Sequence, residues 1–201
     1  MIVDAISGLG SDEFEPDKWG VDVTVGGSQK GLMIPPGLAF CAVSQKAWDL
    51  VKKSTLPRFY YDLNKYNKLV GEGDSPWTPA ISLVMGLGKA LSMVTEEGVD
   101  KFIRRHQEDA GYVRKSVTDS GLKLFSKFPS DAVTAISTPE GVDAGNIIKA
   151  MKSRGITFAP GQGELKGKIF RIAHMGAITR KDLEYALGTL KEVFKEQNIK
   201  V

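Results

Sequence analysis

A lysine at the end of an apolar segment is the residue whose type and position could most directly do chemistry. The run VDVTVGGSQKG, residues 21–31, starts as a β-branched strand and continues through Gly26 and Gly27 to Lys30. The two glycines predict a tight turn. Partial desolvation there can lower the pKa of a lysine amine, so that the neutral amine can attack an aldehyde. These eleven residues alone favour the alternative, a lysine at a strand end that extends into solvent.

An acidic residue occupies a similar position earlier in the chain. Met1-Ile2-Val3 is typical of a buried strand in a parallel sheet, and Asp4 follows at its carboxyl end. Ligands bind beyond the strand ends of such sheets, so Asp4 and Lys30 could face the same crevice. An aspartate that pairs with a protonated ring nitrogen and a lysine that carries an aldehyde as a Schiff base are two of the polar groups of a pyridoxal phosphate site. Asp4 is equally compatible with a loop-capping role.

Other polar and aromatic residues leave two interpretations open. Arg171 stands among apolar residues in KIFRIAHMG and therefore needs a cleft or a partner, such as a structural carboxylate. His174 is typical of a packed or loop histidine, and Cys41 is predicted to be a small core residue on a strand. The aromatic residues Tyr60, Tyr61 and Trp77 could line a substrate cleft or simply pack together.

Composition excludes several classes of function. The 201 residues, 42% apolar and 25% charged, suit one large or two small globular domains. A net charge of +3, with dispersed basic residues, argues against nucleic acid as a partner. The single Cys41 and the widely separated His106 and His174 do not predict a metal site or a disulfide. The sequence shows no apolar run of about 18 residues and no secretory signal, so we expect no membrane span and a cytoplasmic location.

The expected elements divide the chain near residue 98. The first half is predicted to be α/β, with strands and helices at 1–3, 21–25, 38–43, 45–53 and 80–94. A long helix at 98–120 opens the second half, which is predicted to be a smaller α+β unit. Its remaining elements are expected at 122–125, 132–137, 143–154, 156–158, 168–173 and 180–197. Ser44 and Thr179 are expected to cap the helices that follow them.

Four stretches, in this order, resemble a known family: VDAISGLG, GGSQKGLMIPPGLAF, SPWTPAISL and KIFRIAHMG. They are similar to the class V (fold type I) pyridoxal-phosphate-dependent aminotransferases, in the alanine–glyoxylate, serine–glyoxylate and serine–pyruvate branch. The resemblance covers essentially the whole chain. It implies an α/β fold with a mostly parallel sheet and flanking helices. Residues 1–97 would be the remainder of the cofactor-binding large domain, and residues 98–201 the small C-terminal domain.

The resemblance also implies which residues bind pyridoxal phosphate. Lys30 would hold the cofactor as a Schiff base and move the proton of the substrate Cα. Asp4 would keep the pyridine nitrogen protonated, and Ile6 would pack on one face of the ring. Gln29 would lie beside the phosphate, and Thr78 would reach a phosphate in the partner subunit of a homodimer.

The implied reaction is transamination between a small amino acid, serine or alanine, and a small 2-oxo acid, glyoxylate or pyruvate. Arg171 would bind the substrate carboxylate, because a planar guanidinium holds a carboxylate bidentately. Two alternatives remain: another class V reaction, such as phosphoserine transamination or a lyase reaction, and a non-catalytic subunit that keeps only the fold. A core position for Cys41 would weaken the case for class V enzymes that take sulfur with a mobile, accessible cysteine.

The chain departs from the family at its start. Family members carry about as much chain again before the equivalent of Asp4, and that part should contain the phosphate loop, a ring-stacking aromatic and several strands. We therefore expect the isolated chain to be inactive, or to assemble with a complementary N-terminal chain.

Overall fold

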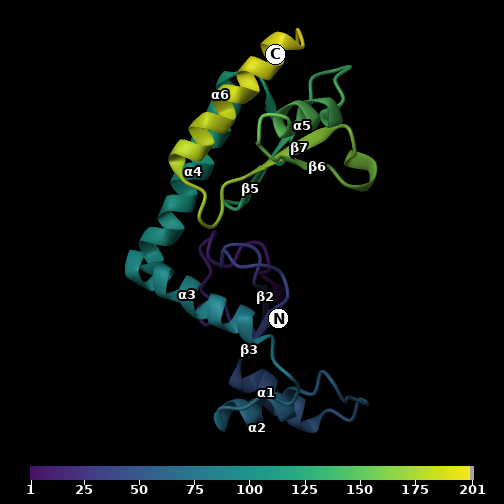
Figure 1. The fold of residues 1–201 in the computed structure, drawn as a ribbon. Helices are drawn as coiled ribbons and strands as arrows, with labels where there is room; N and C mark the ends of the chain where they lie inside the picture. The colour runs from purple at the N-terminus through teal and green to yellow at the C-terminus, as the bar shows by residue number, and fades with distance from the viewer. Residues whose placement is uncertain (200–201) are drawn as a thin grey trace. The chain divides into compact units, whose positions relative to one another are not determined.

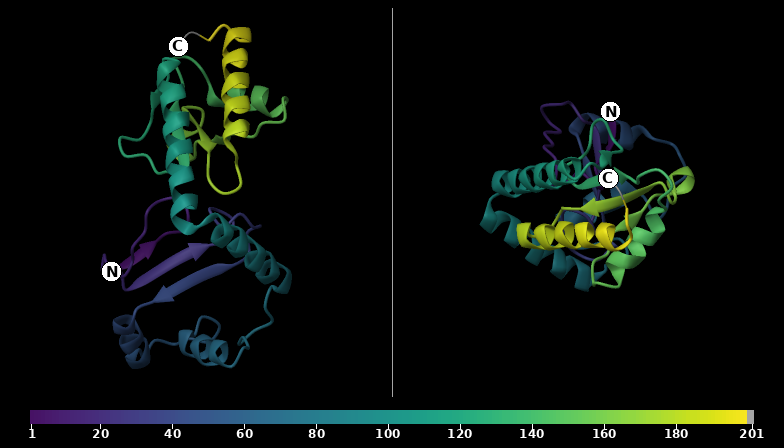
Figure 2. Two further views of the ribbon diagram at one scale, coloured as in Figure 1. Left: turned by 90° about the vertical axis from the view of Figure 1, so that its left-hand side faces the viewer. Right: turned by 90° about the horizontal axis from the view of Figure 1, so that it is seen from above.

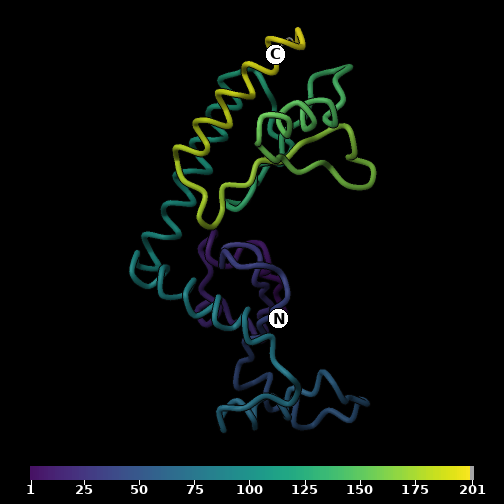
Figure 3. The backbone as a smooth tube through the Cα atoms, in the orientation of Figure 1, coloured from purple at the N-terminus to yellow at the C-terminus, as the bar shows by residue number. Residues whose placement is uncertain are grey.

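The computed structural model describes residues 1–199, which form two compact units (Figure 1). Unit 1 comprises Met1–Leu9 and Phe14–Glu96, and unit 2 comprises Gly10–Glu13 and the chain from Glu97 onward. The short segment Gly10–Glu13 thus belongs to unit 2 although the chain on both sides of it belongs to unit 1. Figure 3 traces the backbone from the N-terminus to the C-terminus. No helix in the described residues has the length and apolar character that a membrane crossing requires.

Unit 1 contains a three-stranded sheet in the order β1-β2-β3 (Figure 2). Its strands are β1 (Ile2–Asp4), β2 (Val23–Gly27) and β3 (Ala39–Val43). Strands β1 and β2 are parallel, with Asp4 opposite Val25, whereas β3 is antiparallel to β2. The parallel pairing that the sequence predicts is confirmed, and it brings the carboxyl ends of β1 and β2 to the same edge.

Three helices accompany this sheet: α1 (Gln45–Lys53), α2 (Leu63–Gly71) and α3 (Ile81–Glu97). The predicted cap of α1 is confirmed, because the Ser44 hydroxyl accepts the Ala47 N–H at 3.2 Å. Helix α2 is not expected from the sequence, where aromatic residues obscure the apolar periodicity. It begins after Asp62, whose carboxylate accepts the Asn64 N–H at 3.1 Å.

Unit 1 exposes much of its apolar surface. Its buried apolar side chains, in the described residues, are small: Ala5, Val21, Ala47 and Ala90. In contrast, Ile2 is 76% exposed and Met85 is 72% exposed. The burial predicted for the first strand is therefore wrong for this chain. The core position predicted for Cys41 is wrong too, because Cys41 lies exposed on the edge strand β3.

Unit 2 is an antiparallel sheet covered by helices. The strands β4 (Lys123–Leu124), β5 (Val133–Ser137), β7 (Ile169–Ala173) and β6 (Ala159–Pro160) lie side by side in that order. The helices are α4 (Val99–Asp119), α5 (Ala144–Lys152) and α6 (Arg180–Glu196), with a short 3₁₀ turn η1 (Gly163–Leu165). Helices α4 and α6 are neighbours (Figure 2).

The core of unit 2 forms where these helices meet the inward faces of β5 and β7. Thr134 and Ile136 are buried while their neighbours are less so, which is the period-two pattern of a strand with one covered face. Strand β6 lies later than the predicted 156–158. The reason is that Phe158 turns into the core and stacks on Phe170, with ring centroids 5.7 Å apart, so that the pairing with β7 starts at Ala159.

Helix α6 begins with a reciprocal cap. The Thr179 hydroxyl accepts the Asp182 N–H at 3.3 Å, and the Asp182 carboxylate accepts the Thr179 N–H at 2.8 Å. Replacing Thr179 by alanine is expected to lower the free energy of unfolding by about 1 kcal/mol. Urea unfolding measures the loss, with Thr179→Ser as the matched control because it keeps the hydroxyl. Equal stability of the two variants would contradict the role of the cap.

Candidate active site

The first part of the candidate site lies where β1 and β2 end. Asp4 is the last residue of β1, and its Oδ1 accepts the Ile6 N–H at 2.9 Å. This contact turns the chain after the strand and uses one carboxylate oxygen. Asp4 is exposed, so its other oxygen is accessible to a ligand beyond the strand. A ring nitrogen that carries a proton is a suitable partner for it.

Two predicted site residues flank a glycine on the neighbouring strand. A Cβ at Gly27 would lie 3.2 Å from Ile6 Cγ2 and 3.1 Å from Gln29 Oε1. Gly26 and Gly27 are both part of β2, so the tight turn predicted at the glycines is wrong, and the turn comes after them. What Gly27 provides is a close approach, because a side chain there would crowd both Ile6 and Gln29.

The segment that carries Lys30 is held by the buried Ser28. Its hydroxyl donates to the Pro35 carbonyl at 2.8 Å and accepts the Leu38 N–H at 3.2 Å. The Lys30 carbonyl accepts the Met33 N–H at 3.0 Å, and Met33 has a φ of 64°, which completes the turn. The loop thus fixes the Lys30 backbone through contacts that do not use its side chain, which is half-buried.

Thr78 is exposed in the loop between α2 and α3. The neighbouring Trp77 anchors this loop, since its ring N–H donates to the Tyr60 carbonyl at 3.1 Å and its ring stacks on that of Tyr60 at 5.0 Å. Tyr60 and Trp77 therefore pack together, one of the two interpretations that the sequence left open for them. Thr78 lies apart from the contacts that join Asp4, Ile6, Gly27 and Gln29.

Arg171 belongs to unit 2 and lies on β7, opposite Ala135 of β5 and Ala159 of β6. Its Nε donates to the Pro160 carbonyl at 3.1 Å. The ion pairs of unit 2, within the described residues, involve other cations: Arg105, Arg114, Lys115, Arg154 and Arg180. Within the described residues, Arg171 therefore has no carboxylate partner of the kind that the sequence offered as one reason for an arginine among apolar residues. Its outer N–H groups can bind a carboxylate ligand bidentately.

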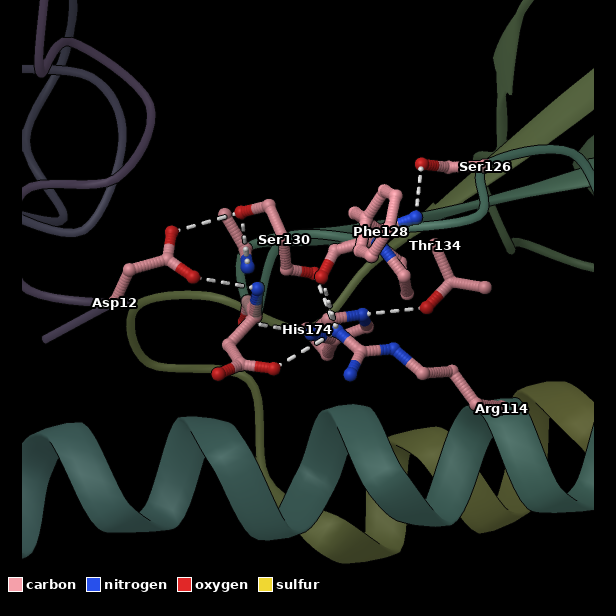
Figure 4. A network of polar contacts seen from close by, with 10 residues as sticks. Asp12, Arg114, Ser126, Phe128, Ser130, Thr134 and His174 are labelled. Atoms are coloured by element: carbon pink, nitrogen blue, oxygen red, sulfur yellow. Dashed lines mark hydrogen bonds and ion pairs between the residues drawn. The ribbon is translucent and has the colours of Figure 1, made fainter.

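A polar network that the sequence did not reveal ties the short segment Gly10–Glu13 to the rest of unit 2 (Figure 4). The Asp12 carboxylate accepts the Ser130 hydroxyl and the Asp131 N–H, each at 2.8 Å. Arg114 of α4 donates to the Asp131 carboxylate at 2.8 Å. Ser130 and Asp131 lie more than a hundred residues from Asp12 in the sequence, so no local spacing indicates their contacts with it.

His174 completes this network in the buried interior. Its Nδ1 lies 3.0 Å from the Asp131 carbonyl, which can only accept, so Nδ1 carries the proton. Its Nε2 accepts the Thr134 hydroxyl at 2.9 Å (Figure 4). Burial lowers the pKa of His174 to about 4, and the imidazole is therefore neutral near pH 7. The structure packs His174 in the interior, which is one of the two positions that the sequence predicts for it.

Helix α4 also fixes the loop that follows β7. His106, fully buried, accepts the Gly176 N–H at 2.7 Å and donates to the Phe102 carbonyl at 2.8 Å, and burial lowers its pKa. Asp109 is buried as well and pairs with Arg180 at 2.7 Å. His106 and Asp109 lie on the same apolar stripe of α4 as Phe102, and this position was the sequence signal for their burial. The interleaved charges on the surface of α4 obscured that signal.

The residues at the end of β1 and β2 fit pyridoxal phosphate. The exposed Asp4 ends β1, Gly27 keeps the approach between Ile6 and Gln29 open, and the half-buried residue Lys30 follows on a fixed loop. The described residues contain no group of three or more histidine, cysteine or carboxylate side chains that is placed to hold a metal ion.

Comparison with known proteins yields one family. The model of the family described as "Aminotransferase class-V" matches residues 1–178. The chain is 44% identical to "Soluble hydrogenase, small subunit" of Synechococcus sp., covering 98% of this chain and 52% of that protein. It is 38% identical to the serine–glyoxylate aminotransferase of Methylorubrum extorquens, covering 100% of this chain and 52% of that protein.

A solved structure agrees with these sequence matches. The pyridoxamine–pyruvate aminotransferase of Mesorhizobium loti superposes with a TM-score of 0.92 at 32% identity, covering 99% of this chain and 53% of that chain. The α/β fold predicted from the resemblance is confirmed by this match. The chain spans about half the length of the curated relatives it matches.

Proposed function

Because the chain belongs to the class V aminotransferase family, we propose that it is the C-terminal part of an enzyme that transfers an amino group from serine or alanine to glyoxylate or pyruvate. The observation that carries this proposal is the position of Asp4 and Lys30 at one edge of the parallel β1–β2 pair. Asp4 and Lys30 suit amino transfer. For this reason we prefer amino transfer to a hydrogenase function, which is what the name of the Synechococcus relative states.

The proposed cofactor is pyridoxal phosphate, which the family uses. When bound, it supplies an aldehyde for amines and a ring that withdraws electrons from the substrate Cα. Lys30 would hold it through Nζ and then accept the proton of the substrate Cα at the same atom. The Asp4 carboxylate would keep the ring nitrogen protonated, and Ile6 would pack on a ring face. Gln29 would contact the phosphate, and Thr78 would contact a phosphate in a second subunit.

Arg171 would bind and orient the substrate carboxylate. Its Nε is held by the Pro160 carbonyl, and the ion pairs described for unit 2 leave its outer N–H groups to a ligand. A fixed carboxylate limits the rotation of the substrate, so that its Cα proton stays within reach of a base. This geometry suits amino acids and 2-oxo acids, which share that carboxylate.

A complementary N-terminal chain is the partner that we propose, in addition to a dimer. Unit 1 exposes large apolar side chains on its strands and helices, which is typical of a surface that another chain covers. The chain also matches only about half of its relatives. The cytoplasmic location expected from the sequence stays a prediction.

Complementation tests the proposal. The chain is mixed with the N-terminal half of the Methylorubrum relative, or fused to it, in the presence of pyridoxal phosphate. We expect a visible absorbance band from the lysine-bound cofactor and transfer of the serine amino group to glyoxylate, from the combination only. A band from the chain alone would contradict the dependence on a partner. Failure of both the mixture and the fusion would contradict the proposed function.

A further inference from the structure

A residue of the neighbouring strand contacts the guanidinium of the proposed substrate arginine. In the two-stranded contact of β6 and β7, Arg171 lies opposite Ala159, and Phe170 lies opposite Pro160. The Arg171 side chain donates from Nε to the Pro160 carbonyl of the neighbouring strand β6 at 3.1 Å. Proline has no N–H for a ladder hydrogen bond, and it is tolerated here because β6 is an edge strand.

The position of that carbonyl depends on the next residue, Gly161. A Cβ at Gly161 would lie 2.2 Å from the Leu165 carbonyl oxygen, 2.7 Å from its carbon and 2.8 Å from Ile169 Cγ1. No positive φ explains this glycine, so the requirement is one of space. The Leu165 backbone cannot retreat easily, because its carbonyl also accepts the Lys168 N–H at 3.0 Å.

The absence of a side chain at Gly161 lets the η1 turn lie directly on the start of β7. The Gly161 N–H donates to the Ile169 carbonyl at 3.1 Å, which closes this turn against the strand. A side chain at this position would push the turn and β6 apart from each other. The Pro160 carbonyl, one peptide away, would then move relative to Arg171 Nε.

We infer that Gly161 is a positioning residue that sets the orientation of the Arg171 guanidinium through the Pro160 carbonyl. This inference rests on the proposed function of Arg171 as the carboxylate-binding residue. With Nε occupied, the two outer nitrogens Nη1 and Nη2 remain for the ligand. The substrate carboxylate is therefore bound end-on by this pair, and the side-on mode that uses Nε and Nη2 is blocked.

Nitrogen-edited NMR of the full chain tests the inference without cofactor or turnover. The Arg171 Nε–H signal, assigned with Arg171→Lys, is expected to exchange with water roughly fivefold more slowly than that of the exposed Arg104. In Gly161→Ala this protection is expected to disappear. The matched control is Gly188→Ala on α6, where an added Cβ meets nothing within 4 Å, and protection of Arg171 should be unchanged.

Acetate provides a second measurement on the native chain, which holds even if Gly161→Ala does not fold. At concentrations on the order of 0.1 M, as weak exposed ion pairs require, acetate should shift the Nη signals of Arg171 and leave Nε in place. Three results would overturn the inference: exchange at Arg171 as fast as at Arg104, protection retained in folded Gly161→Ala, or a joint shift of Nε and Nη2. Failure of the proposed function would appear separately, as the absence of amino transfer after complementation.

Discussion

Replacing Lys30 by alanine is expected to abolish the absorbance band of the lysine-bound cofactor in the complemented protein and to lower amino transfer by at least about 100-fold. The drop corresponds to the low end of what a positioned general base contributes. The physical reason is that Lys30 follows β2 on a loop of fixed conformation, at the end of the parallel pair where Asp4 ends β1. Absorbance spectra and steady-state rates measure both effects.

The expected loss is chemical and does not come from unfolding. The contacts that fix the loop use the Ser28 hydroxyl and the Lys30 backbone carbonyl, which alanine keeps. Lys30→Arg is the charge-matched variant, and it should also lack the band because a guanidinium does not form the Schiff base. Lys53→Ala, at the exposed end of α1, should leave the band unchanged. A band of the lysine-bound cofactor that persists in Lys30→Ala would contradict the assignment of Lys30 as the residue that binds the cofactor.

Acidification is expected to destabilise unit 2 through His174. Burial lowers its folded-state pKa from 6.5 to about 4, so the folded state binds the proton less readily than the unfolded chain. The stability contributed by the neutral imidazole is therefore complete above pH 6.5 and is lost as the pH falls toward about 4. Linkage gives a loss of roughly 3 kcal/mol between pH 7 and pH 4.

The surroundings of His174 explain why protonation is costly. Its Nε2 accepts from Thr134, and a proton there would oppose that hydrogen bond. Arg114 adds a nearby positive charge, whereas Asp131 and Asp109 favour the charged form and offset only part of the burial. The network in Figure 4 is thus built around a neutral ring.

Two measurements check this prediction. As the pH is lowered, the free energy of unfolding should fall less steeply in His174→Gln than in the native chain. Both proteins contain His106, so the difference between their pH dependences reports on His174. A proton NMR titration should place the pKa of one of the two histidines near 4, and the His174→Gln spectrum assigns the signal. A titration of His174 near 6.5 would contradict the argument.

The sequence by itself determined what local interactions control. Helix α1 begins and ends where Ser44 and the apolar spacing indicate, and Thr179 caps α6 as expected. The strand that precedes Lys30 and the position of Asp4 at the end of a parallel strand were also predictable. Caps, turns and periodicity depend on residues a few positions apart, so the sequence displays them directly.

Tertiary structure decided the features that depend on distant contacts. Asp12 binds Ser130, 118 residues away, and His174 is neutral because the fold buries its ring beside Thr134 of β5. Cys41 occupies a strand, as its apolar context suggests, yet it is exposed because burial depends on a covering layer and not on the strand itself. The requirement for glycine at Gly161 arises likewise from the approach of the Leu165 backbone. Burial and close packing are properties of segments brought together by the fold, and for this reason a single sequence does not display them.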